Sequence, residues 1–79
     1  MTLEELKTWM KSHKHVDTAE HRYDECGNLE TMEIFQDGDK LFGIEFLNGH
    51  PLSKYQTPGI YQPHEVIKKT YTATYYEFM

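Results

Sequence analysis

The fold is decided by residues 29–47, LETMEIFQDGDKLFGIEFL. Apolar and polar residues alternate on both sides of the dipeptide Asp37-Gly38, and this pattern is a strong signal for a β-hairpin. A one-residue change of register moves every side chain to the other face of a strand, so burial of one face selects the register. We therefore predict a three-residue connection, residues 36–38, with Gly38 in a left-handed conformation beside a bulge. The apolar residues that this register gathers on one face are Met32, Ile34, Phe42, Ile44 and Phe46.

The start of the chain predicts a helix that runs from Leu3 to about His13. Thr2 is a suitable N-cap, and Glu5 follows it three residues later, which is the spacing of a capping box. Such a helix is too short to be stable alone, so its apolar stripe is expected to pack on the sheet. The apolar residues at helical spacing are Leu3, Leu6 and Met10.

The remaining segments complete an α+β fold. Residues 17–25 predict a strand, and residues 65–78, rich in threonine and tyrosine, predict the last strand. Residues 50–62 carry proline and glycine without a regular period, which indicates a long loop. The predicted fold is a single domain over residues 1–79, with one N-terminal helix packed on a three- to four-stranded antiparallel sheet and a long loop before the last strand.

Length and composition limit the class of protein. A chain of 79 residues buries only roughly 60 % of its unfolded surface, so homo-oligomerisation would be a natural way to add core, and it is left open. Cys26 is the only cysteine, which excludes an internal disulfide and a cysteine-based zinc site. No apolar run approaches the ~20 residues of a membrane span. We expect a cytoplasmic protein without a membrane partner.

The charge is unevenly placed. The net charge is −5, and residues 17–45 carry nine acidic residues against two basic ones. Nucleic-acid binding requires a basic footprint that displaces counterions, so a nucleic-acid partner is not expected. The acidic middle third favours a partner with a basic surface.

No motif predicts catalysis. Cys26 with His21 as a base would need an orienting group and an oxyanion hole, and the sequence indicates neither. Asp37 and Asp39 resemble the start of a calcium loop, but the later oxygen ligands of that loop are missing. Pairs of neighbouring carboxylates such as Glu30 and Glu33 fit a solvated face better than an acid–base pair. The sequence therefore predicts no enzyme, no catalytic residues and no cofactor.

Metal binding is the alternative function. His13 and His15 could contribute two ligands, helped by His21 or Cys26. The spacing is unspecific, and cationic residues near a helix C-terminus also have a structural role. No metal ligand is assigned on this pattern alone.

The abundance of aromatic residues favours an interface. Six tyrosines and four phenylalanines exceed what so small a core can fully bury, and tyrosine is enriched at protein interfaces. The sequence thus predicts a small acidic, non-enzymatic protein-binding module, an adaptor or an inhibitor that occupies a basic groove of its partner. The expected contact residues are two loop tyrosines and three acids of the hairpin: Tyr55, Tyr61, Glu33, Asp37 and Asp39.

Overall fold

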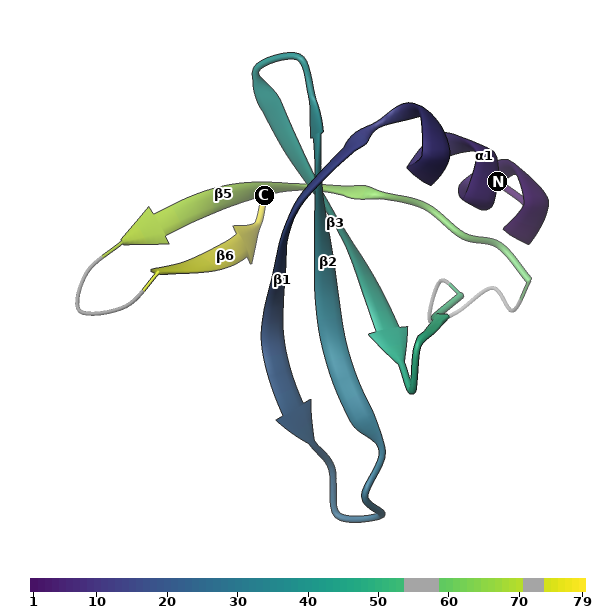
Figure 1. Cartoon of the computed structure of the whole chain (residues 1–79), viewed down its shortest axis with the longest axis vertical. Helices are drawn as coiled ribbons and strands as arrows, with labels where there is room; N and C mark the ends of the chain where they lie inside the picture. Colours follow the sequence, from purple (N-terminus) through teal and green to yellow (C-terminus); the bar gives the residue numbers. More distant parts are fainter. Residues whose placement is uncertain (54–58, 71–73) are drawn as a thin grey trace.

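The computed structural model describes residues 1–53, 59–70 and 74–79 (Figure 1). Its elements in chain order are α1 (Leu3–Ser12), β1 (Lys14–Tyr23), β2 (Leu29–Asp37), β3 (Lys40–Leu47), β4 (His50–Pro51), β5 (His64–Thr70) and β6 (Thr74–Phe78). Over these described ranges the strands form one six-stranded sheet in the order β1-β2-β3-β5-β6, with β4 paired beside β5 on the same edge of β3. All of the pairings are antiparallel.

The predicted fold class is wrong in its balance of helix and sheet. The chain is mostly sheet, and the six strands of its described part exceed the three to four predicted. The predicted last strand is two strands, because Thr70 pairs with Thr74 and the chain reverses between them. The predicted long loop begins with the short strand β4. The N-terminal helix and the antiparallel arrangement are confirmed.

The capping box of α1 is confirmed. The Thr2 hydroxyl accepts a hydrogen bond from the Glu5 N–H at 3.2 Å, and the Glu5 carboxylate accepts one from the Thr2 N–H at 3.0 Å. Hydrogen bonds from the backbone and side chain of Thr2 to the Glu5 carboxylate hold the pKa of Glu5 below its ordinary value, because they favour the charged form. The helix ends at Ser12, and β1 begins at Lys14 after the extended residue His13. In the described part of the chain, no helix has the length and apolar character needed to cross a membrane.

The predicted register of the central hairpin is wrong. Asp37 pairs with Lys40, so the connection has two residues, Gly38 and Asp39. Gly38 has a φ of +63° at the first loop position, which is the requirement of a type II′ turn. In this register the apolar residues do not share one face, since Ile34 lies opposite Gly43 and Met32 lies opposite Glu45.

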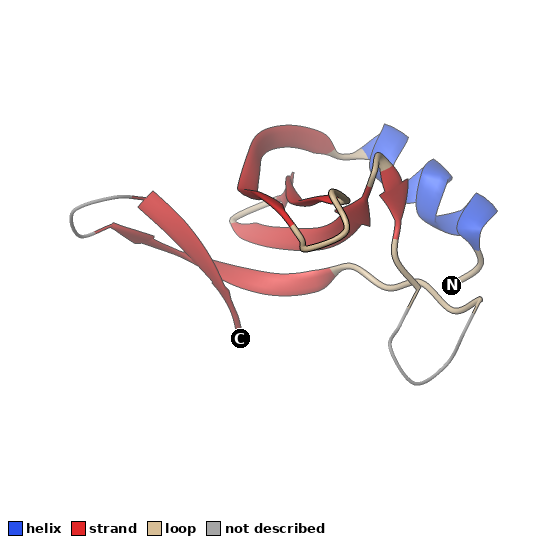
Figure 2. Ribbon diagram, turned by 90° about the horizontal axis from the view of Figure 1, so that it is seen from below, coloured by secondary structure: helices blue, strands red, loops and turns tan. Residues whose placement is uncertain are grey.

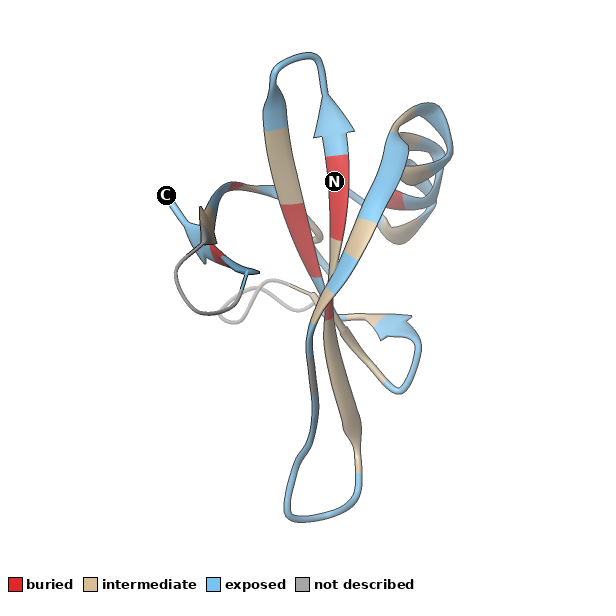
Figure 3. Cartoon of the chain, turned by 60° about the vertical axis from the view of Figure 1, so that its left-hand side comes forward, coloured by how far each residue is buried: buried red, intermediate tan, exposed pale blue. Residues whose placement is uncertain are grey.

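Both faces of the sheet are buried in its middle, and this explains the register. One face carries a cluster of Met32, Ile34, Val66 and Tyr76. The other face carries Leu6, Phe35 and Ile44, with Trp9 and Met10 of α1 packed against them. Figure 3 shows these buried positions midway along the strands and on the inner side of the helix. The assumption that only one face of the hairpin is buried therefore predicts the wrong register between β2 and β3.

The sheet is curled, so that its first and last strands come into contact. Irregular pairing between Ala19 and Arg22 interrupts β1, and Glu20 has a φ of +52° there, in keeping with the added twist of a bulge. The Tyr76 hydroxyl of β6 donates a hydrogen bond of 2.8 Å to the Asp17 carboxylate of β1. Figure 2 shows the curl from below, with α1 and the β5–β6 hairpin at opposite ends of the molecule.

The contact between Tyr76 and Asp17 gives a prediction at alkaline pH. Burial, followed by the hydrogen bond to Asp17, raises the pKa of Tyr76 to about 12. An unfolded tyrosine loses its proton near pH 10, so between roughly pH 10 and 12 the folded state holds a proton that the unfolded state has lost. The contribution of Tyr76 to stability is thus complete below about pH 10 and is lost as the pH rises through about 12.

Tyr76→Phe is expected to lower the free energy of unfolding at pH 7 by about 1 kcal/mol, because Asp17 loses its hydrogen-bond donor. The variant should also lose less further stability than the natural chain between pH 10 and 12. Urea unfolding at pH 7, 10, 11 and 12 measures both effects. Equal alkaline losses in the two proteins would show that this hydroxyl is not the group that titrates.

Candidate functional site

Four of the five predicted contact residues are described by the structure, namely Tyr61, Glu33, Asp37 and Asp39. Tyr55 lies outside the described residues. Tyr61 is half-buried and packs against the cluster of Leu6, Phe35 and Ile44. Its backbone exchanges two hydrogen bonds of 2.7 Å with Met1, one in each direction. Tyr61 therefore anchors the segment before β5 to the start of the chain.

Two of the three predicted acids have partners within the chain. The Glu33 carboxylate accepts a hydrogen bond of 2.8 Å from the Thr18 hydroxyl and lies 3.3 Å from His15 Nε2. Its second oxygen, Oε2, is buried without a hydrogen-bond partner. The Asp37 carboxylate lies 3.6 Å from His13 Nε2. The third acid, Asp39, is exposed in the turn that projects from the sheet (Figure 1).

The rings of the two N-terminal histidines contact aromatic side chains of α1 and β2. The His13 ring stacks on Trp9 with 4.1 Å between ring centroids, and its Nδ1 lies 2.6 Å from the Trp9 carbonyl oxygen. The His15 ring meets Phe35 edge-on at 5.2 Å. Each histidine also faces a different carboxylate of β2. The histidines considered for metal binding are thus paired, within the chain, with two of the acids predicted to contact a partner.

The described residues contain no group of three or more His, Cys, Asp or Glu side chains arranged to hold a metal ion. His13 and His15 face separate acids, Cys26 is exposed in the turn after β1, and the side chain of His21 is outside the described part. These described residues therefore provide no three-ligand site for metal binding, the alternative function.

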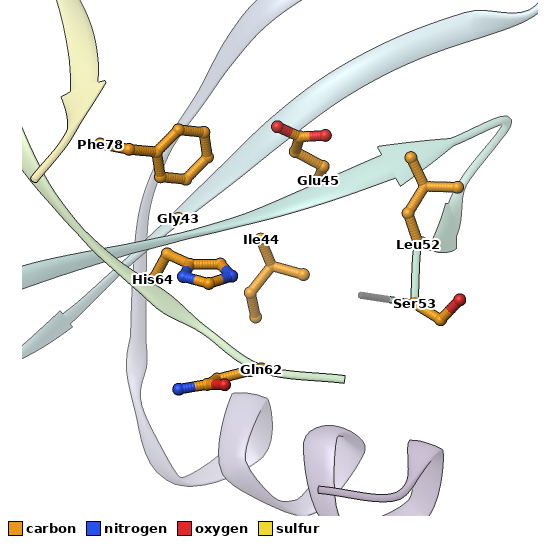
Figure 4. A pocket seen from close by; sticks show the side chains of 8 residues that line it. All are labelled: Gly43, Ile44, Glu45, Leu52, Ser53, Gln62, His64 and Phe78. Carbon is orange, nitrogen blue, oxygen red and sulfur yellow. The ribbon is translucent and has the colours of Figure 1, made fainter. Parts of the chain in front are cut away.

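A pocket that the sequence analysis did not identify lies beside the edge of β3. It has a volume of about 630 Å³ and opens to solvent, and this size falls within the range of ligand-binding clefts. Figure 4 shows Ile44 near its centre, Phe78 and His64 on one side, and Leu52 on the opposite side. The described residues that line it are Gly43, Ile44, Glu45, Leu52, Ser53, Gln62, His64 and Phe78.

The pocket exists because two short pairings leave part of the β3 edge uncovered. Strand β5 pairs with Leu41–Gly43, whereas β4 pairs only with Phe46–Leu47. Ile44 and Glu45 lie between the two pairings, and one backbone bond from the Leu52 N–H to the Glu45 carbonyl, 2.9 Å long, closes the β4 side. Pro63 immediately precedes β5, whose described pairing with β3 begins at His64.

The pocket combines apolar walls with an acidic edge. Leu52 is 42 % exposed and Phe78 is 45 % exposed, although both are large apolar side chains. His64 meets Phe78 edge-on, with 5.7 Å between ring centroids. Glu45 is exposed, and its carboxylate is the only acidic group among the described lining residues. The arrangement suits an apolar group that carries a neighbouring positive charge.

The pocket does not assemble a nucleophile with its base. The Ser53 hydroxyl and the His64 imidazole belong to opposite walls (Figure 4). A serine nucleophile requires a base within hydrogen-bond distance.

Sequence reasoning missed the pocket because its residues are spread over four segments of the chain. Leu52 and Phe78 have no distinctive spacing, and their exposure depends on where β4 and β5 leave the edge of β3. The only local signals are the turn Asn48-Gly49, where both residues have positive φ, and Pro63. These signals indicate where strands end, but they do not indicate which edge is left uncovered.

Comparison with known proteins gives no match to this chain, whether with protein-family models, with curated proteins or with solved structures.

Proposed function

We propose that this chain is a small, acidic, non-enzymatic protein-binding module that acts as an adaptor or an inhibitor of a protein with a basic surface. The observation that carries the proposal is the exposure of large apolar side chains on a chain with so small a core. Exposed apolar surface rimmed by polar groups is typical of protein interaction sites. Two of these exposed apolar side chains, Leu52 and Phe78, line the pocket.

The charge distribution supports a basic partner. The net charge is −5, and the β2–β3 turn that projects from the sheet presents the carboxylate of Asp39 (Figure 1). Exposed charges of this kind steer association and make its rate sensitive to salt. The exposed free thiol of Cys26 agrees with the reducing cytoplasm as the expected compartment.

The test begins with capture of binding proteins from the native cell extract on the immobilised chain, at low and at high salt. A retained protein is then purified, and its binding to the chain is measured by calorimetry. A defined stoichiometry, with an affinity that falls as salt is added, is the expected result. Absence of any protein that binds directly, or retention of nucleic acid instead, would contradict the proposal.

Asp39→Asn should slow association with such a partner about two- to fivefold without a comparable change in dissociation, because a rim charge acts mainly on the encounter rate. Glu25→Gln is the matched control, since Glu25 is also an exposed acid in a turn but lies at the other end of β2. Stopped-flow measurement of both variants at several salt concentrations separates the two rates. Equal association rates for the two variants would remove the steering role of the hairpin.

A further inference from the structure

We propose that the pocket beside β3 is the docking site for an extended segment of the protein partner, in which an apolar side chain is next to a lysine or arginine. This inference rests on the proposed function and adds the site and the chemistry of the recognised segment. The structural basis is the juxtaposition of an uncovered strand edge, three apolar side chains and one carboxylate. These residues are Ile44, Glu45, Leu52 and Phe78.

The apolar part of the pocket suits a large aliphatic or aromatic side chain. Ile44 is 3 % exposed and belongs to the core, whereas Leu52 and Phe78 stand on opposite sides of it and are each more than two-fifths exposed (Figure 4). A side chain between them would cover both at once. At about 630 Å³ the space is large enough for a side chain together with part of its backbone.

The edge of β3 suits an extended backbone. The Asn48 N–H bonds to the Leu29 carbonyl, whereas the Glu45 carbonyl accepts from the Leu52 N–H. Even-numbered residues of β3 therefore direct their backbone groups toward β2, and odd-numbered residues direct theirs toward the pocket edge. This alternation points the Glu45 N–H toward the stretch that neither β4 nor β5 pairs with. The Glu45 N–H is therefore one backbone donor that an extended segment bound in the pocket can use.

Charge complementarity selects a basic residue beside the apolar one. The exposed Glu45 carboxylate adjoins the pocket, and no lysine or arginine is among the described lining residues, although Arg22, which is paired with Glu30, lies near enough to Glu45 for their charges to attract. A lysine or arginine flanking the bound side chain would pair with Glu45, and a cation can also lie against the ring of Phe78. An acidic flank would be repelled by Glu45 and by the net charge of −5.

The experiment is a nuclear magnetic resonance titration of the ¹⁵N-labelled chain with three acetylated, amidated heptapeptides. Their central residues are Lys-Leu-Lys, Lys-Ala-Lys and Glu-Leu-Glu, each between Gly and Ser flanks. We expect the Lys-Leu-Lys peptide to shift the amide signals of Ile44, Glu45, Leu52 and His64. It should bind at least about fivefold more tightly than the other two peptides.

Two variants with matched controls test the contacts. Leu52→Ala and Glu45→Gln should each weaken binding of the Lys-Leu-Lys peptide about threefold or more. Ile67→Ala and Glu77→Gln are the controls, because Ile67 is 41 % exposed and pairs with the exposed Glu77 outside the pocket. Since all four side chains are exposed, thermal melting of each variant should confirm an intact fold.

The outcomes separate this inference from the proposed function. Shifts confined to residues 36–40, equal binding of the three peptides, or no shifts at all would overturn the pocket as the docking site. The proposed function would still stand if the captured protein binds directly. Pocket signals that shift with the concentration of the chain alone would show that a second copy occupies the site, and this would also overturn the inference.

Discussion

Leu6→Ala is expected to lower the free energy of unfolding by about 2–5 kcal/mol, as is usual for truncation of a buried leucine. Leu6 is 0 % exposed and is the one buried residue of α1, a helix of ten residues. Helices of this length are not stable alone, so α1 depends on this contact with Phe35 and Ile44. The loss would be a large part of the stability of a chain this small, which is expected near the low end of ~5–15 kcal/mol.

Leu3→Ala is the control for this prediction, because it makes the same chemical change in the same helix at a half-buried position. The substitution changes helix propensity by no more than about a few tenths of a kcal/mol at either position, so the difference in stability reports mainly burial. Urea unfolding followed by Trp9 fluorescence is a suitable measurement, since Trp9 lies 5.6 Å from the Phe35 ring. Equal losses in the two variants would mean that α1 is not held by Leu6.

The structure shows which features a local reading of this sequence can predict. The helix was predictable because its signals are close together: Thr2 and Glu5 form the capping box within the first turn. The existence of the β2–β3 hairpin was predictable from Gly38 and the alternating flanks. Each of these predictions rests on contacts between residues that are near in the chain.

Features that depend on distant contacts were not predictable in the same way. The hairpin register follows from burial on both faces, which requires Tyr76 and Val66 of the last strands on one side and Leu6 on the other. The division of the last strand into β5 and β6 carries no turn signal, because residues 71–73 are Tyr-Thr-Ala. The predicted strand over residues 17–25 begins earlier, at Lys14, because β1 follows the helix directly.

The candidate site shows the same limit. The sequence drew attention to His13, His15, Glu33 and Asp37 as separate groups, and the structure pairs each histidine with one of the acids. Conversely, the residues of the pocket lie apart in the chain and have no shared motif. They are brought together by the pairing of β4 and β5 along β3 and by the pairing of β6 with β5.

Gly43→Ala is expected to lower the free energy of unfolding by about 1–3 kcal/mol through overpacking. A Cβ at Gly43 would lie 2.7 Å from the Met32 sulfur and 3.0 Å from a Val66 methyl carbon. Met32 is 0 % exposed and Val66 is 4 % exposed, so neither side chain can turn out into solvent. The methyl group would reduce the entropy of the unfolded chain, an effect of about 0.4–1 kcal/mol that the steric conflict outweighs.

A double-mutant cycle with Met32→Ala identifies this conflict as the cause. Met32→Ala alone should cost about 2–5 kcal/mol, because it leaves a cavity in the core. In the Met32→Ala background, the methyl group added by Gly43→Ala enters the vacated space. The stability losses of the two single variants should therefore sum to at least about 1 kcal/mol more than the loss of the double variant. Urea unfolding of the four proteins measures the coupling.

Gly38→Ala is the matched control for the cycle. Position 38 also favours glycine, but because of its backbone conformation and not because of a close neighbour. Its φ is +63°, and a Cβ there would meet no atom within 4 Å. Gly38→Ala should therefore destabilise the turn through backbone strain, and its loss should add to that of Met32→Ala without coupling. If Gly43→Ala also shows additive losses, close approach to Met32 is not what excludes a side chain at position 43. Coupling at Gly43 alone would instead show that β3 carries a glycine there because Met32 occupies the space that a side chain would need.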